Sequence, residues 1–136
     1  MVRPRVYLAG PAVFLVDAKK ALAAQVKIAA RYGLDGVPPA LDVDLTGLDG
    51  LEAARGIRAA NIARIRSCQG IIACVTPFRG PDPDPGTLWE AGFAEGFGMK
   101  IALWREDAPG DLFGRHVAES FAGAAEILAR DFGVTA

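Results

Sequence analysis

The sequence predicts an α/β fold: a flavodoxin-like or Rossmann-like open parallel sheet of about five strands, with helices on both faces in a three-layer α/β/α arrangement. Short and continuously apolar segments alternate along the chain with longer amphipathic segments. Strands that are buried on both faces of a parallel sheet have this continuously apolar character, and a strand–helix alternation is typical of such sheets. Glycine and proline residues lie at the boundaries between the segments.

The pattern assigns each element to a residue range. Strands are expected at 6–9, 36–39, 71–75 and 101–104, and helices at 17–32, 51–68, 86–97 and 120–132. The segments 40–50 and 106–114 are expected to be loops. Ligands bind beyond the carboxyl ends of the strands in open parallel sheets. We therefore expect the functional site among the loops 10–15, 76–85 and 105–114.

Length and composition exclude several classes of protein. A chain of 136 residues fits a single domain, residues 1–136. Hydrophobic residues make up 51% of the chain, which predicts a well-filled core or an apolar interface between subunits. The formal net charge is -1 and no basic run is present, so neither nucleic acid nor an anionic membrane is expected as a partner.

The residues that bind metals and cofactors are scarce. Cys68 and Cys74 match no zinc or redox spacing, and are expected to be buried thiols in a reducing cytoplasm. His116 is the only histidine, which argues against a histidine-based metal cluster. Walker A and Gly-x-Gly-x-x-Gly motifs are absent from the first strand–helix turn. We expect no metal and no cofactor.

The sequence also predicts a cytoplasmic location. The apolar run at 6–9 is broken by Gly10 and Pro11, unlike a secretory signal peptide. No apolar stretch approaches the roughly 20 residues that a membrane span needs.

Side chains that could take part in binding or catalysis are concentrated in the segment 77–90 (PFRGPDPDPGTLWE), which follows the predicted central strand. Asp84 before Pro85 has the form of an N-cap followed by proline at the first helical position. Thr87 and Glu90 fit a capping box if the helix begins later. One helix has one N-cap, so one of the two carboxylates, Asp84 or Glu90, is expected to stay free beside the helix amino terminus.

Two polar side chains elsewhere are ambiguous from the sequence alone. Asn61 lies on an apolar stripe with Ile57 and Ile65. Its amide either bonds a loop backbone in the core or holds a ligand or a catalytic carboxylate. Tyr7 on the first strand is either a core residue or the donor of a hydrogen bond to a catalytic carboxylate.

Together these residues resemble the nucleoside 2-deoxyribosyltransferase family. The matching features are the segment 6–11 (VYLAGP), Asn61 with Ile65 and Cys68 after it, the segment 77–80 (PFRG), the string Asp-x-Gly-Thr-x-x-Glu-x-Gly-x-Ala at 84–94, and Gly98 with Lys100. The resemblance runs from residue 5 to about residue 104. The string at 84–94 is the most specific part of it.

The resemblance implies a function and a set of site residues. It assigns Glu90 as the nucleophile that forms a covalent deoxyribosyl-enzyme, Asp84 as the residue that handles the proton of the base, and Tyr7 as the residue that orients Glu90. Breakage of a glycosidic bond passes through an oxocarbenium-like state, for which one attacking carboxylate and one acid suffice. Substrate-binding residues are expected at Gly10, Pro11, Asn61, Phe78, Arg79, Gly86 and Thr87.

The expected reaction is transfer of the 2-deoxyribosyl group between nucleobases, with a nucleoside or nucleotide and a free nucleobase as partners. Transferases of this family use an asparagine near the carboxyl terminus, supplied by a neighbouring subunit. This chain has no asparagine after Asn61, although His116, Glu119 or Ser120 could take that place. Two alternatives therefore stay open: an N-glycosidase acting on a nucleoside or nucleoside 5′-monophosphate, and a nucleoside-binding module without catalysis. A homodimer or higher homo-oligomer is expected, with the region after Gly110 closing a neighbour's site.

Overall fold

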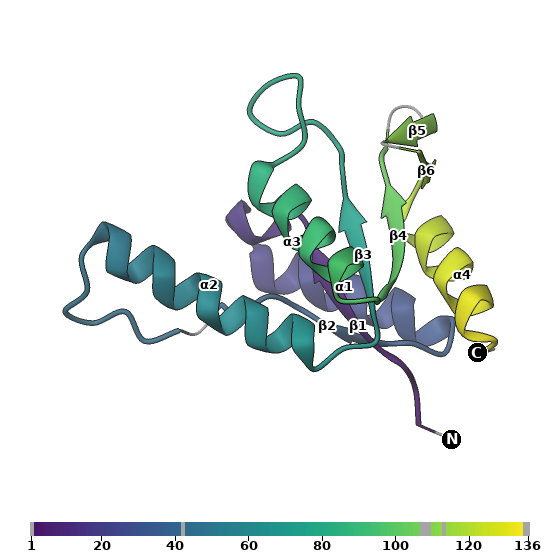
Figure 1. Cartoon of the computed structure of the whole chain (residues 1–136), viewed down its shortest axis with the longest axis horizontal. Helices are drawn as coiled ribbons and strands as arrows, with labels where there is room; N and C mark the ends of the chain where they lie inside the picture. The colour runs from purple at the N-terminus through teal and green to yellow at the C-terminus, as the bar shows by residue number, and fades with distance from the viewer. Residues whose placement is uncertain (1, 42, 107–109, 113, 135–136) are drawn as a thin grey trace.

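A computed structural model describes residues 2–41, 43–106, 110–112 and 114–134 (Figure 1). Its six-stranded sheet has the order β2-β1-β3-β4-β6-β5. The strands are β1 (Arg5–Ala9), β2 (Asp35–Val37), β3 (Gly70–Cys74), β4 (Lys100–Trp104), β5 (Gly110–Leu112) and β6 (Arg115–Ala118). All neighbours pair in parallel except β5, which is antiparallel to β6. The five parallel strands have the flavodoxin-like order, which confirms the predicted fold class.

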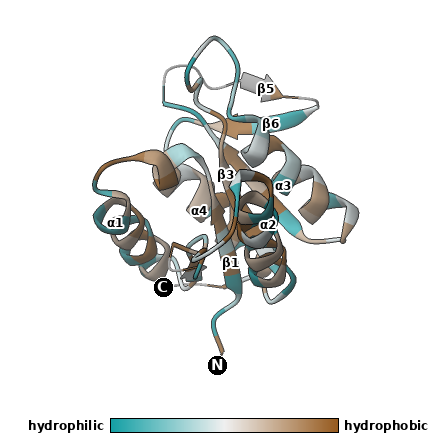
Figure 2. Cartoon of the chain, turned by 90° about the vertical axis from the view of Figure 1, so that its left-hand side faces the viewer, coloured by the Kyte–Doolittle hydropathy of each residue, from teal (hydrophilic) through white to brown (hydrophobic). Residues whose placement is uncertain are grey.

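Helices cover both faces of the sheet. Figure 2 shows α1 (Ala18–Arg31) and α4 (Phe121–Phe132) on one side of the strands, and α2 (Gly50–Arg66) and α3 (Pro85–Gly96) on the other. Side chains alternate along β1 accordingly: Val6 and Leu8 lie in the core beneath α1 and α4, whereas Tyr7 and Ala9 lie in the core beneath α2 and α3. The three-layer arrangement is therefore confirmed.

The helices begin where short polar side chains can cap them. Asp49, Asp84 and Ser120 each accept a hydrogen bond from the backbone N–H three residues further on, at the starts of α2, α3 and α4. All four predicted helices are present, with boundaries within two residues of those expected. No helix in the described residues is long and apolar enough to cross a membrane.

The segment after β4 corrects one expectation. The predicted loop 106–114 falls partly outside the described residues, but Gly110–Leu112 forms β5 within it, and the unpredicted strand β6 follows at once. The sequence of β6, Arg-His-Val-Ala, has no continuous apolar character. Its pairing with Leu103 and Trp104 is a tertiary contact that the local pattern does not reveal.

The sheet has a switch point at β1, which carries β2 on one side and β3 on the other. The chain leaves β1 through a short 3-10 helix, η1 (Pro11–Phe14), and leaves β3 through the loop that leads to α3. Crevices at such switch points are the usual ligand sites of open α/β sheets. In Figure 1, α2 extends well beyond the edge of the sheet, together with the chain that precedes it.

Candidate active site

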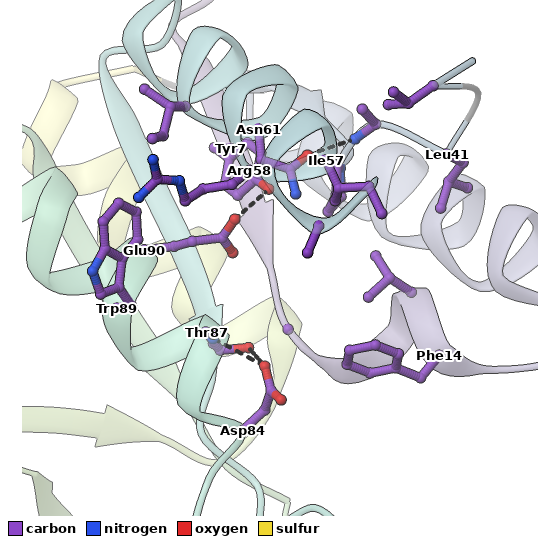
Figure 3. Close-up of a pocket in the computed structure, with 18 of the residues that line it drawn as sticks. Tyr7, Phe14, Leu41, Ile57, Arg58, Asn61, Asp84, Thr87, Trp89 and Glu90 are labelled. Atoms are coloured by element: carbon purple, nitrogen blue, oxygen red, sulfur yellow. Dashed lines mark hydrogen bonds between the residues drawn. The ribbon is translucent and has the colours of Figure 1, made fainter. Parts of the chain in front are cut away.

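A cavity of about 610 Å³ opens at this switch point, between η1, α2, α3 and the segment 39–45 (Figure 3). Tyr7 of β1 contributes to its floor, and Asn61, Asp84, Thr87 and Glu90 add polar groups. The rest of the lining is mostly apolar. A largely apolar pocket with a few convergent polar groups is typical of small-molecule sites.

Tyr7 and Glu90 meet inside this cavity. The Tyr7 hydroxyl donates a hydrogen bond of 2.9 Å to Oε2 of Glu90. Tyr7 is fully buried in the sheet, so its hydroxyl holds the carboxyl group of Glu90 from the side of the sheet. Figure 3 shows the other carboxyl oxygen of Glu90 directed into the cavity. Tyr7 is thus both a core residue and the hydrogen-bond donor that the sequence suggested.

Burial perturbs both partners. The pKa of Glu90 is raised from 4.5 to about 7: burial is the largest cause, the hydrogen bond from Tyr7 opposes it, and the negative charge of Asp84 adds to it. Burial, the charge of Glu90 and the hydrogen bond to Glu90 together raise the pKa of Tyr7 far above its ordinary value, so the hydroxyl keeps its proton. A carboxyl group with a pKa near neutrality in a cleft is typical of a functional site.

Asp84 occupies the N-cap of α3. Its Oδ2 accepts hydrogen bonds of 3.0 Å from both the backbone N–H and the hydroxyl of Thr87. Pro85 takes the first helical position, so the capping interpretation is correct for Asp84 and wrong for Thr87 and Glu90. Glu90 is therefore the free carboxylate. It lies in the second turn, where no backbone N–H needs it.

Asn61 joins α2 to the segment 39–45. Its Oδ1 accepts a hydrogen bond of 2.9 Å from the backbone N–H of Ala40. Figure 3 shows its amide nitrogen turned toward the cavity. The loop bond expected of a structural Asn61 is present, and the side chain also lines the site.

The expected site residues fall into two groups. Tyr7, Gly10, Asn61, Asp84, Gly86, Thr87 and Glu90 all line the cavity. Pro11 and Phe78 do not; they line a neighbouring cavity of about 270 Å³ near Cys74 and Trp104. Arg79 lines neither cavity. Gly10 lies between the two cavities, and a Cβ atom at this position would lie 2.9 Å from the Cβ of Cys74.

Several lining residues escaped the sequence analysis. Phe14, Arg58 and Trp89 all line the cavity, as do the apolar residues of the segment 39–45, namely Pro39, Ala40, Leu41, Val43 and Leu45. Phe14 and Trp89 carried a usable signal, because Phe14 lies in a predicted site loop and Trp89 precedes Glu90. Nothing in the sequence marks Arg58 or the segment 39–45 as part of the site, because only the packing of α2 brings these residues to the cavity. No group of three or more potential metal ligands occurs in the described part of the chain.

The fold and the cavity define a flavodoxin-like α/β protein with two carboxylates at the topological switch point of its sheet. The sequence model of the nucleoside 2-deoxyribosyltransferase family matches residues 6–123. The chain therefore belongs to this family.

Individual relatives agree with this assignment. The solved structure of a 2-desoxiribosyltransferase from Leishmania mexicana has a TM-score of 0.77 and 27% identity, covering 93% of this chain and 97% of that chain. A CMP N-glycosidase from Clostridium botulinum shares the fold, with a TM-score of 0.55 and 18% identity over 91% of this chain and 97% of its own. An uncharacterized protein from Schizosaccharomyces pombe is 34% identical over 112 residues. These residues cover 76% of this chain, which spans about half the length of that curated relative.

Proposed function

We propose that the protein transfers the 2-deoxyribosyl group of a nucleoside from one nucleobase to another, through a covalent glycosyl intermediate on Glu90. The observation that carries this proposal is the buried Tyr7–Glu90 pair in a cavity large enough for a nucleoside. Family membership supports the reaction class.

Glu90 has the properties that a carboxylate nucleophile needs. In the first step, the free oxygen of ionised Glu90 forms a bond to C1′ of the sugar while the bond from C1′ to the base nitrogen breaks. The hydrogen bond from Tyr7 occupies the other oxygen and fixes the direction of attack. Burial leaves the carboxylate weakly solvated, which increases its reactivity toward an oxocarbenium-like carbon.

Asp84 serves the leaving base. The electron pair of the broken bond remains on the base nitrogen, and Asp84 donates or relays the proton that neutralises it. Its Oδ1 has no hydrogen-bond partner among the described residues and is available for this role. In the second step a nitrogen of another base attacks C1′, Glu90 leaves as a carboxylate, and the proton of that nitrogen returns to Asp84.

The charges around the cavity favour a nucleoside over a nucleoside monophosphate. Among the described residues of the lining, Arg58 is the only one with a cationic side chain, and Asp84 and Glu90 are anionic. The guanidinium of Arg79 lies outside the cavity. A phosphate dianion would therefore meet two carboxylates and a single arginine, an unfavourable balance in an apolar cavity.

Hydrolysis is the second candidate. Asn61 is the last asparagine of the sequence, so the chain lacks the carboxyl-terminal asparagine that the resemblance associates with transfer. Ser120, a possible substitute, uses its hydroxyl to cap α4. With water in place of the second base, the same glycosyl–Glu90 intermediate would give the free sugar.

A homo-oligomer belongs to the same proposal. Trp89 on α3 and Phe97, the C-cap residue of that helix, are 49% and 53% exposed, and both stack on Phe93 between them. Because Trp89 also lines the cavity, a second copy that covers this aromatic row would close the site.

One incubation separates these functions. The protein is mixed with a 2′-deoxynucleoside, with and without a different free base, and the products are separated by chromatography. Transfer gives a new nucleoside only when the second base is present. Free deoxyribose in both mixtures identifies a hydrolase, and an unchanged nucleoside with measurable binding identifies a binding module.

A further inference from the structure

Three side chains form a cluster at the mouth of the cavity: Phe14 of η1, and Phe78 and Arg79 of the loop after β3. The rings of Phe14 and Phe78 stack with centroids 5.4 Å apart and planes 18° from parallel. The central guanidinium carbon of Arg79 lies 4.8 Å from the centroid of Phe14 and 4.7 Å from that of Phe78. Phe14 lines the 610 Å³ cavity, whereas Arg79 does not.

The backbone holds Arg79 in an unusual conformation. Its φ of 59° is the only positive value at a non-glycine residue in the described chain. The surrounding loop is well defined, because the N–H of Phe78 bonds the carbonyl of Asp82 at 3.1 Å and Pro77 bridges to Pro83. A left-handed backbone conformation is strained for arginine, because its Cβ atom crowds the following carbonyl oxygen. Such strain persists where the surrounding structure enforces it, often near functional sites.

The 3-10 helix that carries Phe14 has little anchorage of its own. It contains no buried residue, and its N-cap, Gly10, forms no side-chain capping bond. The Phe14 side chain is 51% exposed. The direction of its ring therefore depends on Phe78 and Arg79 more than on the core.

We propose that Arg79 is a positioning residue that acts through Phe14. Its guanidinium fixes the Phe14 ring as an aromatic wall of the cavity, against which the planar base of the substrate packs, and Arg79 itself does not touch the substrate. The planar guanidinium can lie against aromatic rings in a way that an ammonium cannot. The role of the wall rests on the proposed function; the role of Arg79 in fixing the ring does not.

The test uses Arg79→Gly. Glycine adopts a positive φ without strain, so this variant removes the guanidinium while the loop keeps its backbone conformation. We expect KM for the nucleoside to rise about two- to fivefold, the equivalent of one exposed cation–π contact, while kcat changes less than twofold. Arg79→Lys should restore only part of the affinity. An unchanged KM in Arg79→Gly would overturn the proposal.

A double mutant tests whether Arg79 acts through the ring. If it does, Arg79→Gly combined with Phe14→Leu should have the same KM as Phe14→Leu alone. Effects that multiply would show that Arg79 acts independently of Phe14, and would overturn the proposal. Lys100→Ala is the matched control, since it removes a cation–π contact on Phe132 at the opposite end of the strands. It should leave KM unchanged.

A spectroscopic readout keeps the inference separate from the proposed function. The protein is labelled with 4-fluorophenylalanine, and the ¹⁹F resonance of Phe14 is assigned by its loss in Phe14→Leu. Arg79→Gly should move this resonance toward its position in the unfolded chain. A stationary resonance overturns the proposal even if nucleosides are turned over. A shifted resonance in a protein that acts on no nucleoside supports the positioning role and rejects the proposed function alone.

Discussion

The hydroxyl of Tyr7 donates a hydrogen bond of 2.9 Å to the carboxyl group of Glu90, across 83 residues of sequence. It joins the central part of the sheet to the second turn of α3. Because Tyr7 is fully buried, this donor cannot turn away from the carboxylate without disturbing the core.

Glu90→Gln should abolish turnover. The amide cannot form the covalent bond to C1′, so kcat should fall at least about a thousandfold. Glu95→Gln on the same helix is the matched control: it loses only an exposed ion pair with Arg115 and should keep its activity. Steady-state kinetics on a 2′-deoxynucleoside measure both. Substantial activity in Glu90→Gln would exclude Glu90 as the nucleophile.

The activity should depend on the ionisation of Glu90. Because the attacking form is the carboxylate and its pKa is about 7, kcat/KM should rise with pH and reach half its maximum near pH 7. In Tyr7→Phe the hydrogen bond that lowers this pKa is absent, so the midpoint should move to higher pH. A midpoint that stays in place or moves down would contradict the assigned role of Tyr7.

The free energy of unfolding should also depend on the ionisation of Glu90, but it should fall as pH rises, whereas the activity rises. The pKa of Glu90 is raised from 4.5 to about 7 by folding. Between these values the folded chain therefore holds a proton that the unfolded chain has lost, and stability falls as pH rises through this window. Relative to the wild type, Glu90→Gln should gain unfolding free energy as pH rises from 4.5 to 7, by roughly 3 kcal/mol at most. Urea unfolding at pH 5 and pH 8 measures it: the gain should be small at pH 5 and large at pH 8, and an equal gain at both would indicate a cause other than ionisation.

Substitutions of Asp84 should separate its two roles. Asparagine retains an N-cap acceptor, so Asp84→Asn should fold as stably as the wild type, whereas Asp84→Ala should lose about 1 kcal/mol. Both should slow the reaction of natural nucleosides far more than that of substrates whose leaving group needs no proton. Equal losses for both substrate types would mean that Asp84 only positions the site.

The aromatic row on α3 should mediate self-association. Phe97→Glu places a charge in this row and should convert an oligomer into a monomer, as measured by light scattering. Val2 is 91% exposed and lies elsewhere, so Val2→Glu should not change the mass. A wild-type chain that is monomeric and fully active would reject the oligomer.

Mixing two inactive chains tests a shared site. One chain carries Glu90→Gln and the other carries His116→Ala and Glu119→Ala, which change two exposed side chains after Gly110 and leave β6 and α4 in place. Recovered activity requires a site built from two chains. Mixed oligomers without activity would show that each chain builds its own site.

The sequence alone determined the features that depend on neighbouring residues. The alternation of apolar runs and amphipathic segments was enough to predict the flavodoxin-like sheet, because burial on both faces of a strand leaves a local signature. The segment 84–90 also predicted that one of the two carboxylates, Asp84 or Glu90, would stay free, because a helix has only one N-cap. The structure then decided that Asp84 is the cap and Glu90 the free carboxylate.

Only the tertiary structure decided how distant segments meet. The Tyr7–Glu90 bond, the contact of Asn61 with Ala40 and the packing of Arg79 on Phe14 join elements that are far apart in sequence. The strand β6 exists because β4 offers it a parallel edge, not because Arg-His-Val-Ala favours a strand. Such contacts depend on where the folded sheet places each segment, and the strand or helix propensity of a segment does not predict this. The sequence was therefore enough to predict the carboxylates of the site, whereas the fold determined which other side chains form the cavity around them.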